Sequence, residues 1–222
     1  MIIAIFDRLL FYRKLTFICL SLFILSAQAS PELTQVLSKY TKASSVEVSL
    51  KKTDEKNALG TKTSSEGILK FSKNKIYILL NGDKKIEFYY KANKIWLVEY
   101  PDLDFDKNGK RKVTILTKST PVLLKGLINL FSNQKKFLKE FKIVKESKDQ
   151  DNLIVELKPT EKNLKSFSLV INVKERSINQ VTFVDDVDTK TTLELSQLKL
   201  NRKMTAADFQ FKSQKTDEVI PE

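Results

Sequence analysis

The sequence predicts a mainly β (α+β) protein in which helices cover one face of a single, strongly curved antiparallel sheet. From residue 45 onward, apolar and polar residues mostly alternate, as they do in half-buried strands. Short segments with turn residues separate these runs, as in β-hairpins. Helical spacing is confined to one segment before the first strand and two segments in the middle of the chain. Three helices placed in this way can cover one face of such a sheet.

The first 29 residues have the features of a secretory signal peptide. Basic residues precede an apolar run over 15–25, and the segment ends in the small-residue sequence SAQA. We therefore expect cleavage after Ala29, export and one domain over residues 30–222. Cys19 lies within the apolar run and lacks the small residues that precede the cysteine of a lipoprotein signal, so we do not expect it to be lipidated.

The order of the remaining elements follows from the same patterns. Ser30 can cap a helix that begins at Pro31, and Leu33, Val36, Leu37 and Tyr40 recur at helical spacing. A short helical turn is expected at 205–209, and the residues from Lys212 onward resemble a loose tail. The roughly ten antiparallel strands that we expect cover 45–50, 67–71, 76–80, 86–90, 95–100, 112–116, 152–157, 166–173, 179–184 and 191–200.

Two helices are expected in the middle of the chain, the second over 134–141. The first, STPVLLKGLINLF at 119–131, has Ser119 or Thr120 as its cap, but it is apolar on nearly every side. Only Lys125, Gly126 and Asn129 interrupt its apolar residues. A membrane-spanning helix needs about 20 apolar residues, and this run has roughly half that number. The helix therefore belongs to the core or covers an apolar ligand.

The composition argues against most enzyme chemistry. The chain has no histidine, and its one cysteine lies in the signal segment, which removes the commonest general base, zinc ligands and thiol nucleophiles. The stretch DFDKNG at 104–109 matches the first six positions of a calcium loop, but Ile115 stands where the last carboxylate ligand belongs. A hairpin turn explains the stretch better. We predict no enzyme activity, no catalytic residue, no metal and no cofactor.

The chain carries a formal net charge of +12. Such an excess suits contact with anionic lipid headgroups, cell-wall polymers or an acidic partner, although lysines that only keep the outside of a sheet soluble explain it as well. Nucleic acid is not expected as a partner outside the cytoplasm.

Large apolar and aromatic side chains are concentrated between residues 67 and 100. An ordinary core would account for each of them, yet the central helix has more apolar surface than one contact face requires. We therefore predict a hydrophobic cavity under a lid, which could hold an acyl chain at roughly 0.8 kcal/mol per buried methylene. The expected cavity wall consists of Leu69, Phe71, Tyr77, Leu79, Phe88, Tyr90, Trp96 and Val98. The expected lid consists of Leu123, Leu124, Leu127, Ile128 and Phe131.

The ordered set of motifs resembles the LolA family, the periplasmic carriers of outer-membrane lipoproteins. GILKF, NKIWLVEYP and TPVLLKG follow the family's order, and residues 157–211 have its spacing of L-x-P, paired strands, acidic turn and F-x-F. The resemblance runs from about Glu32 to Ile220. It implies a half-open barrel with an N-terminal helix and central lid helices over its concave apolar face. It also implies a monomeric, soluble carrier that takes acylated lipoproteins from an inner-membrane ABC transporter to an outer-membrane acceptor lipoprotein.

The sequence departs from the family pattern in two places. Lys73 and Asn74 stand where the family has Arg-Pro, so the resemblance assigns the lid contact to Lys73. Residues 212–215 replace the family's P-x-G. Three alternatives remain open: an envelope lipid sensor of the same fold that binds a regulatory protein, an enzyme acting on lipids or polysaccharide, and an anchored acceptor lipoprotein. The missing histidine and mature cysteine argue against the last two.

Overall fold

The computed structural model describes residues 29–221 except 57–58, 103, 106–107 and 118–121. The predicted signal peptide, apart from Ala29, the expected capping residues Ser119 and Thr120, and part of the DFDKNG stretch therefore lie outside the described residues. No helix in the described part of the chain is both long and apolar enough to cross a membrane.

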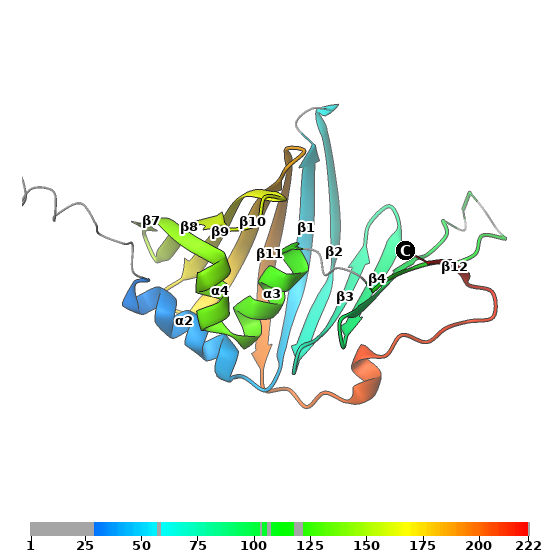
Figure 1. Ribbon diagram of the computed structural model, residues 1–222, viewed down its shortest axis with the longest axis horizontal. Coiled ribbons are helices and arrows are strands. Elements are labelled where there is room, and N and C mark those ends of the chain that lie inside the picture. Colours follow the sequence, from blue (N-terminus) through cyan, green and yellow to red (C-terminus); the bar gives the residue numbers. More distant parts are fainter. Residues whose placement is uncertain (1–28, 57–58, 103, 106–107, 118–121, 222) are drawn as a thin grey trace, which may run out of the picture.

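Twelve strands form one open, curled sheet with the order β12-β6-β5-β4-β3-β2-β1-β11-β10-β9-β8-β7 (Figure 1). Neighbouring strands are antiparallel except β12 and β6, which are parallel. The strands are β1 (Val46–Lys56), β2 (Thr61–Ser72), β3 (Lys75–Asn81), β4 (Lys85–Lys91), β5 (Lys94–Glu99), β6 (Lys112–Leu116), β7 (Phe141–Asp149), β8 (Asn152–Pro159), β9 (Leu164–Asn172), β10 (Ser177–Asp185), β11 (Thr189–Leu200) and β12 (Glu218–Pro221). The predicted fold class is confirmed.

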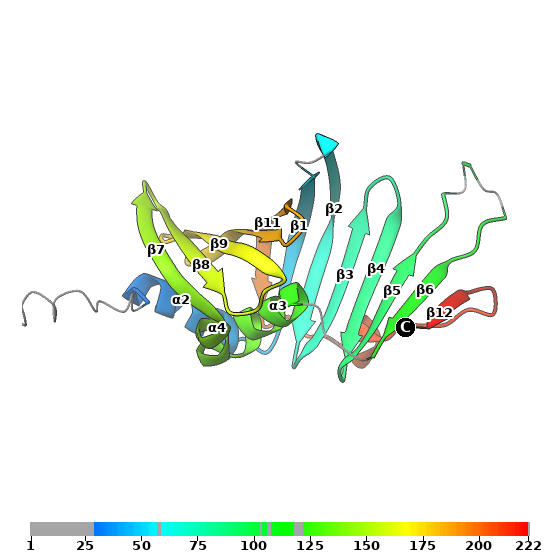
Figure 2. The same ribbon diagram turned by 45° about the horizontal axis from the view of Figure 1, so that its top comes forward.

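Three α-helices of the described chain lie over one half of this sheet. They are α2 (Pro31–Lys42), α3 (Val122–Ser132) and α4 (Gln134–Glu140), with a short 3-10 helix, η2 (Ala206–Phe209), near the C-terminus. Ser30 caps α2 as predicted, because its hydroxyl accepts a hydrogen bond from the Leu33 N–H at 3.2 Å. Figures 1 and 2 show α2, α3 and α4 grouped beside strands β7 to β11 and β1, whereas β3 to β6 extend away from the helices.

The side chains under the helices form one hydrophobic core. It includes the predicted apolar residues of α2, the inward residues of β1 and β2, and three phenylalanines whose rings contact one another, Phe137, Phe141 and Phe167. Phe131 of α3 connects helix α2 to the sheet, because its ring centroid lies 5.6 Å from that of Tyr40 on α2 and 5.5 Å from that of Phe71 on β2. We call the face that carries this core the helix-side face and the opposite one the outer face.

Two hairpin turns form as the sequence predicts. Lys73 and Asn74 join β2 to β3, Ala92 and Asn93 join β4 to β5, and all four have positive φ. Two-residue turns of this kind suit the right-handed twist of the paired strands, and asparagine tolerates the left-handed conformation better than most residues.

Two strands were not predicted. Five of the nine residues of β7 are charged, so its sequence resembles a surface loop, yet it pairs with β8 along its whole length. The predicted loose tail from Lys212 is wrong for its last residues, because β12 pairs with β6 at the edge of the sheet. Before this strand, residues 201–217, which we call the C-terminal strap, cross the outer face of β3 to β5.

Candidate functional site

The helix-side face of β3 to β5 continues the surface on which the core lies, and Figure 2 shows that no described helix lies over these strands. Strand register places Phe71, Ile76, Tyr90 and Ile95 in one cross-strand row on this face, and all four are buried. The following rows on the same face remain half-buried. We call them the open apolar face, and its residues are Ile78, Leu80, Ile86, Phe88 and Leu97.

The open apolar face has a polar border at one end. The register pairs Ile86 with Glu99 and Glu99 with Lys112, so the outermost apolar row continues into charged side chains on the same face. At the other end, the buried row connects the open apolar face to α3. The face is therefore a one-sided apolar surface bounded by the core and by charge, a form that suits an amphiphilic ligand better than a polar one.

The structure separates the eight predicted wall residues into two groups. Leu69, Phe71, Phe88 and Tyr90 lie on the helix-side face. Register places the other four on the outer face, so the prediction that all eight share one face is wrong for Tyr77, Leu79, Trp96 and Val98. The cause is that β3 and β5 are apolar on both faces, and alternation then does not identify the inner one. The inward residues Ile78, Leu80, Ile86 and Leu97 were missed for the same reason.

The C-terminal strap explains the aromatic residues on the outer face. The ring of Phe211 stacks on Trp96 with centroids 6.1 Å apart and meets Tyr89 edge-on at 6.0 Å. Tyr77 packs beside Tyr89 with ring centroids 5.0 Å apart. Burial raises the pKa of Tyr77 to about 12, so its hydroxyl stays protonated at neutral pH. These aromatic residues therefore hold a distant segment of the same chain.

Two ion pairs anchor the strap. Lys70 on β2 lies 2.8 Å from Asp208 of η2, and Arg111 before β6 lies 2.8 Å from Asp217. The side chain of Asp217 is 1% exposed, and its hydrogen bonds with the Arg111 guanidinium hold its pKa below the ordinary range. The strap thus joins the end of β11 to the far edge of the sheet and keeps the outer face of β3 to β5 covered.

Helix α3 stands at the border between the covered and open halves of the helix-side face. Of the predicted lid residues, Leu124, Leu127 and Phe131 are buried in the core, and Ile128 is half-buried against it. Leu123 belongs to the helix, but its side chain lies outside what the structure describes. A lid function of α3 therefore stays a prediction.

Each interruption in the apolar helix α3 has a structural reason. Lys125 forms ion pairs with Glu161 at 2.6 Å and with Glu140 at 3.5 Å. The buried amide of Asn129 donates a hydrogen bond to the other carboxylate oxygen of Glu140. A Cβ at Gly126 would lie 2.9 Å from the Phe141 ring, so only glycine fits this contact without displacement. Sequence reasoning did not identify Glu140 and Glu161, because they lie 15 and 36 residues from Lys125.

The structure contradicts the predicted contact between Lys73 and the lid. Lys73 occupies the tip of the β2–β3 turn with φ +48°, where its side chain is exposed. It has no hydrogen bond or ion pair with any residue that the structure describes. The left-handed turn places the Lys73 side chain in solvent instead of against α3.

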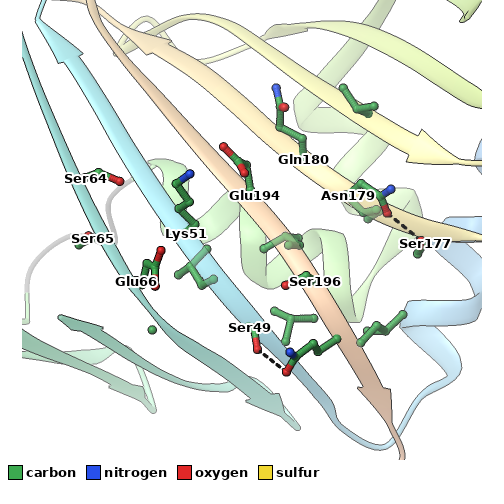
Figure 3. A pocket seen from close by; sticks show the side chains of 18 of the residues that line it. Ser49, Lys51, Ser64, Ser65, Glu66, Ser177, Asn179, Gln180, Glu194 and Ser196 are labelled. Atoms are coloured by element: carbon green, nitrogen blue, oxygen red, sulfur yellow. Dashed lines mark hydrogen bonds between the residues drawn. The ribbon is translucent and has the colours of Figure 1, made fainter. Parts of the chain in front are cut away.

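A polar hollow of about 1240 Å³ lies on the outer face over β1, β2, β10 and β11 (Figure 3). Hydroxyl, amide and charged side chains make up most of its lining. Two pairs of them form hydrogen bonds, Ser49 with Gln197 and Ser177 with Asn179. Sequence reasoning did not predict it, because no motif distinguishes these residues from the other side chains of the strands. The hollow lies on the face opposite the open apolar face, so the two surfaces do not form one site.

The sequence model of a known family matches most of the chain. The family is described as outer membrane lipoprotein carrier protein LolA, and the match covers residues 41–212. The chain belongs to this family. The resemblance deduced from its motifs is thereby confirmed, whereas no curated protein matches the chain.

Solved structures with a similar fold are distant in sequence. A LolA superfamily protein from Nitrosomonas europaea is 10% identical, with 80% of this chain and 97% of that chain covered and a TM-score of 0.39. The lipoprotein LppX of Mycobacterium tuberculosis is 11% identical, with 78% and 95% covered and a TM-score of 0.40. A chain of the Pseudomonas aeruginosa MucA/MucB complex is 10% identical, with 82% and 60% covered and a TM-score of 0.41. The likeness extends no further than the fold.

Proposed function

We propose that the protein is a periplasmic carrier that binds the acyl chains of lipoproteins on the open apolar face and moves them from the inner to the outer membrane. The observation that carries the proposal is the open apolar face itself. Its five large apolar side chains lie on one face beside the core, and no described helix covers them. Exposed apolar area gathered in one place is typical of a binding surface for apolar matter.

The free energy of acyl-chain binding expected for this face suits a carrier, which must also release its cargo. Complete burial of a sixteen-carbon chain is worth on the order of 10 kcal/mol, at roughly 0.8 kcal/mol per methylene. A chain lying on an open face buries about half of its surface, which reduces this to about 5 kcal/mol. One chain would then bind weakly, and the several chains of one lipid anchor would together bind more tightly.

Helix α3 is the element that we expect to meet the bound chain, because it borders the open apolar face and presents the half-buried Ile128.

The partners that we expect are acylated lipoproteins, an inner-membrane lipoprotein-releasing ABC transporter and an outer-membrane acceptor lipoprotein. We expect the carrier itself to act as a monomer without a cofactor. Periplasmic location follows from the same proposal.

Titration of the mature protein with a fluorescent triacylated lipopeptide tests this function. We expect Phe88→Asp to weaken binding at least 10-fold, because a carboxylate in the middle of the open apolar face would have to be desolvated by the chain. Val144→Asp is the matched control, since Val144 is 60% exposed on β7, away from β3 to β5.

Thermal unfolding would establish that both variants fold. Unchanged lipopeptide binding in folded Phe88→Asp would refute the proposed site. Failure of the unaltered protein to bind the lipopeptide, together with a stable complex with a regulatory protein, would favour the sensor alternative.

A further inference from the structure

Six lysines gather at one end of the sheet, and we call this region the basic end. They come from the last residue of α2, the turns β2–β3 and β4–β5, and the start of the C-terminal strap: Lys42, Lys73, Lys75, Lys91, Lys94 and Lys203. Four of them, at 42, 73, 91 and 203, are exposed, and the other two are half-buried. The elements meet at this end because Ser72 donates a hydrogen bond to the Ser44 carbonyl, and Ser45 donates one to the Arg202 carbonyl.

Three of these lysines face one another across neighbouring strands. Lys91 pairs with Lys94, and the pairing of Ile76 with Tyr90 places Lys75 opposite Lys91. Like charges directly opposite each other destabilise a sheet. None of the six lysines has an ion-pair partner in the described part of the chain, and Lys94 lies over the Trp96 ring instead. The fold thus keeps an electrostatic repulsion that its own residues do not relieve.

Nearby carboxylates are engaged elsewhere. Asp208 pairs with Lys70, and Glu47 pairs with Arg202 and Lys199. The opposite end of the sheet has a different character, because its turns carry the exposed carboxylates of Asp83, Asp104, Asp186 and Asp188 beside the lysines 84 and 110. Of the two ends of the sheet, the basic end therefore carries the larger uncompensated positive charge.

The kind of partner follows from what the basic end lacks. The exposed large hydrophobic residues of the described chain are Leu59, Phe105, Val144, Val187, Val219 and Ile220, and none of them belongs to this end. Stable protein interfaces contain a buried apolar centre, which these lysines cannot provide. Lysines on separate turns suit a broad anionic surface, because each lysine contributes independently to the affinity of the protein for that surface. We propose that the basic end binds the anionic phospholipid headgroups of a membrane.

Such docking would place the open apolar face close to the membrane. Ile78 and Leu80 follow Lys75 by three and five residues on β3, and the rise of a strand is about 3.3 Å per residue. The open apolar face therefore begins about 10 Å from the basic end and extends to about 17 Å. Headgroup binding does not depend on acyl binding, so it goes beyond the proposed carrier function and can be tested without a lipoprotein.

Co-sedimentation of the mature protein with vesicles tests the proposal. The vesicles contain phosphatidylcholine alone or with about one third phosphatidylglycerol, at low and physiological salt. We expect binding only to the anionic vesicles, weakening as salt is added. Each lysine near an anionic surface is worth roughly 5-fold in affinity, so the double variant Lys75→Gln/Lys91→Gln should bind about 25-fold more weakly.

The control removes equal charge from the other end, with Lys84→Gln/Lys110→Gln, and should leave binding within about 2-fold of the unaltered protein. Because Lys75 and Lys91 repel each other, their double variant should unfold at the same or a higher temperature, which separates lost docking from lost folding. Absence of binding to anionic vesicles at low salt would overturn the proposal. Equal losses in the two double variants, or binding to an acidic protein but not to vesicles, would also overturn it.

Discussion

Replacement of Phe131 by alanine tests how α3 is held. The Phe131 side chain is 1% exposed, and its ring touches Tyr40 of α2 and Phe71 of β2. Buried Phe→Ala changes cost about 3–5 kcal/mol, because apolar contacts are lost and a cavity remains. A domain of this size is stable by about 5–15 kcal/mol. We therefore expect Phe131→Ala to remove at least about a fifth of the free energy of unfolding.

Urea unfolding followed by circular dichroism measures this loss. With an m-value near 2–3 kcal/mol/M, the midpoint should fall by about 1–2 M. Ile128→Ala serves as a comparison on the same helix, and it should cost only about 1 kcal/mol because its side chain is half-buried. A loss below 1 kcal/mol for Phe131→Ala would refute the reasoning, since α3 would then rest on the sheet without sharing its core.

Three further predictions concern α3 and the strap. Gly126→Ala should destabilise the protein by about 1 kcal/mol in the same urea assay. Overpacking against Phe141 costs about 1–3 kcal/mol, and the higher helix propensity of alanine offsets about 1 kcal/mol of this cost. The double variant Gly126→Ala/Phe141→Leu should recover the loss. Asp217→Asn should lower the melting temperature at pH 7, and the difference should shrink as the pH falls below about 4, because a carboxylate with a lowered pKa stabilises the fold only while it is ionised. Phe211→Ala should destabilise by about 1–2 kcal/mol and shift the emission of Trp96, the only tryptophan of the chain, to the red.

Local signals in the sequence predicted the elements well. The Ser30 cap, the helical spacing up to Tyr40 and the asparagines at positions 74 and 93 of the hairpin turns each act within a few residues. Such signals do not need the rest of the fold. The order of motifs along the chain added the family and the curled sheet with its helices.

The failures of sequence reasoning concern contacts between distant segments. Apolar residues occupy both faces of β3 and β5, and only the strap, more than 100 residues further on, decides that Trp96 faces outward. The strap itself resembles a loose tail because its anchors are single residues such as Phe211 and Asp217. Strand β7 was missed because an edge strand next to solvent carries the charged residues of a loop.

Photo-crosslinking tests the central claim most directly. A triacylated lipopeptide with a diazirine near the middle of one acyl chain would be bound to the mature protein, irradiated and mapped by peptide mass spectrometry. The proposed site predicts crosslinks to β3, β4 and β5 at the residues of the open apolar face, above all Phe88 and Leu97, with α3 as the neighbouring element. Crosslinks on outer-face residues such as Leu79, or uptake of the lipopeptide with no crosslink in these three strands, would contradict it.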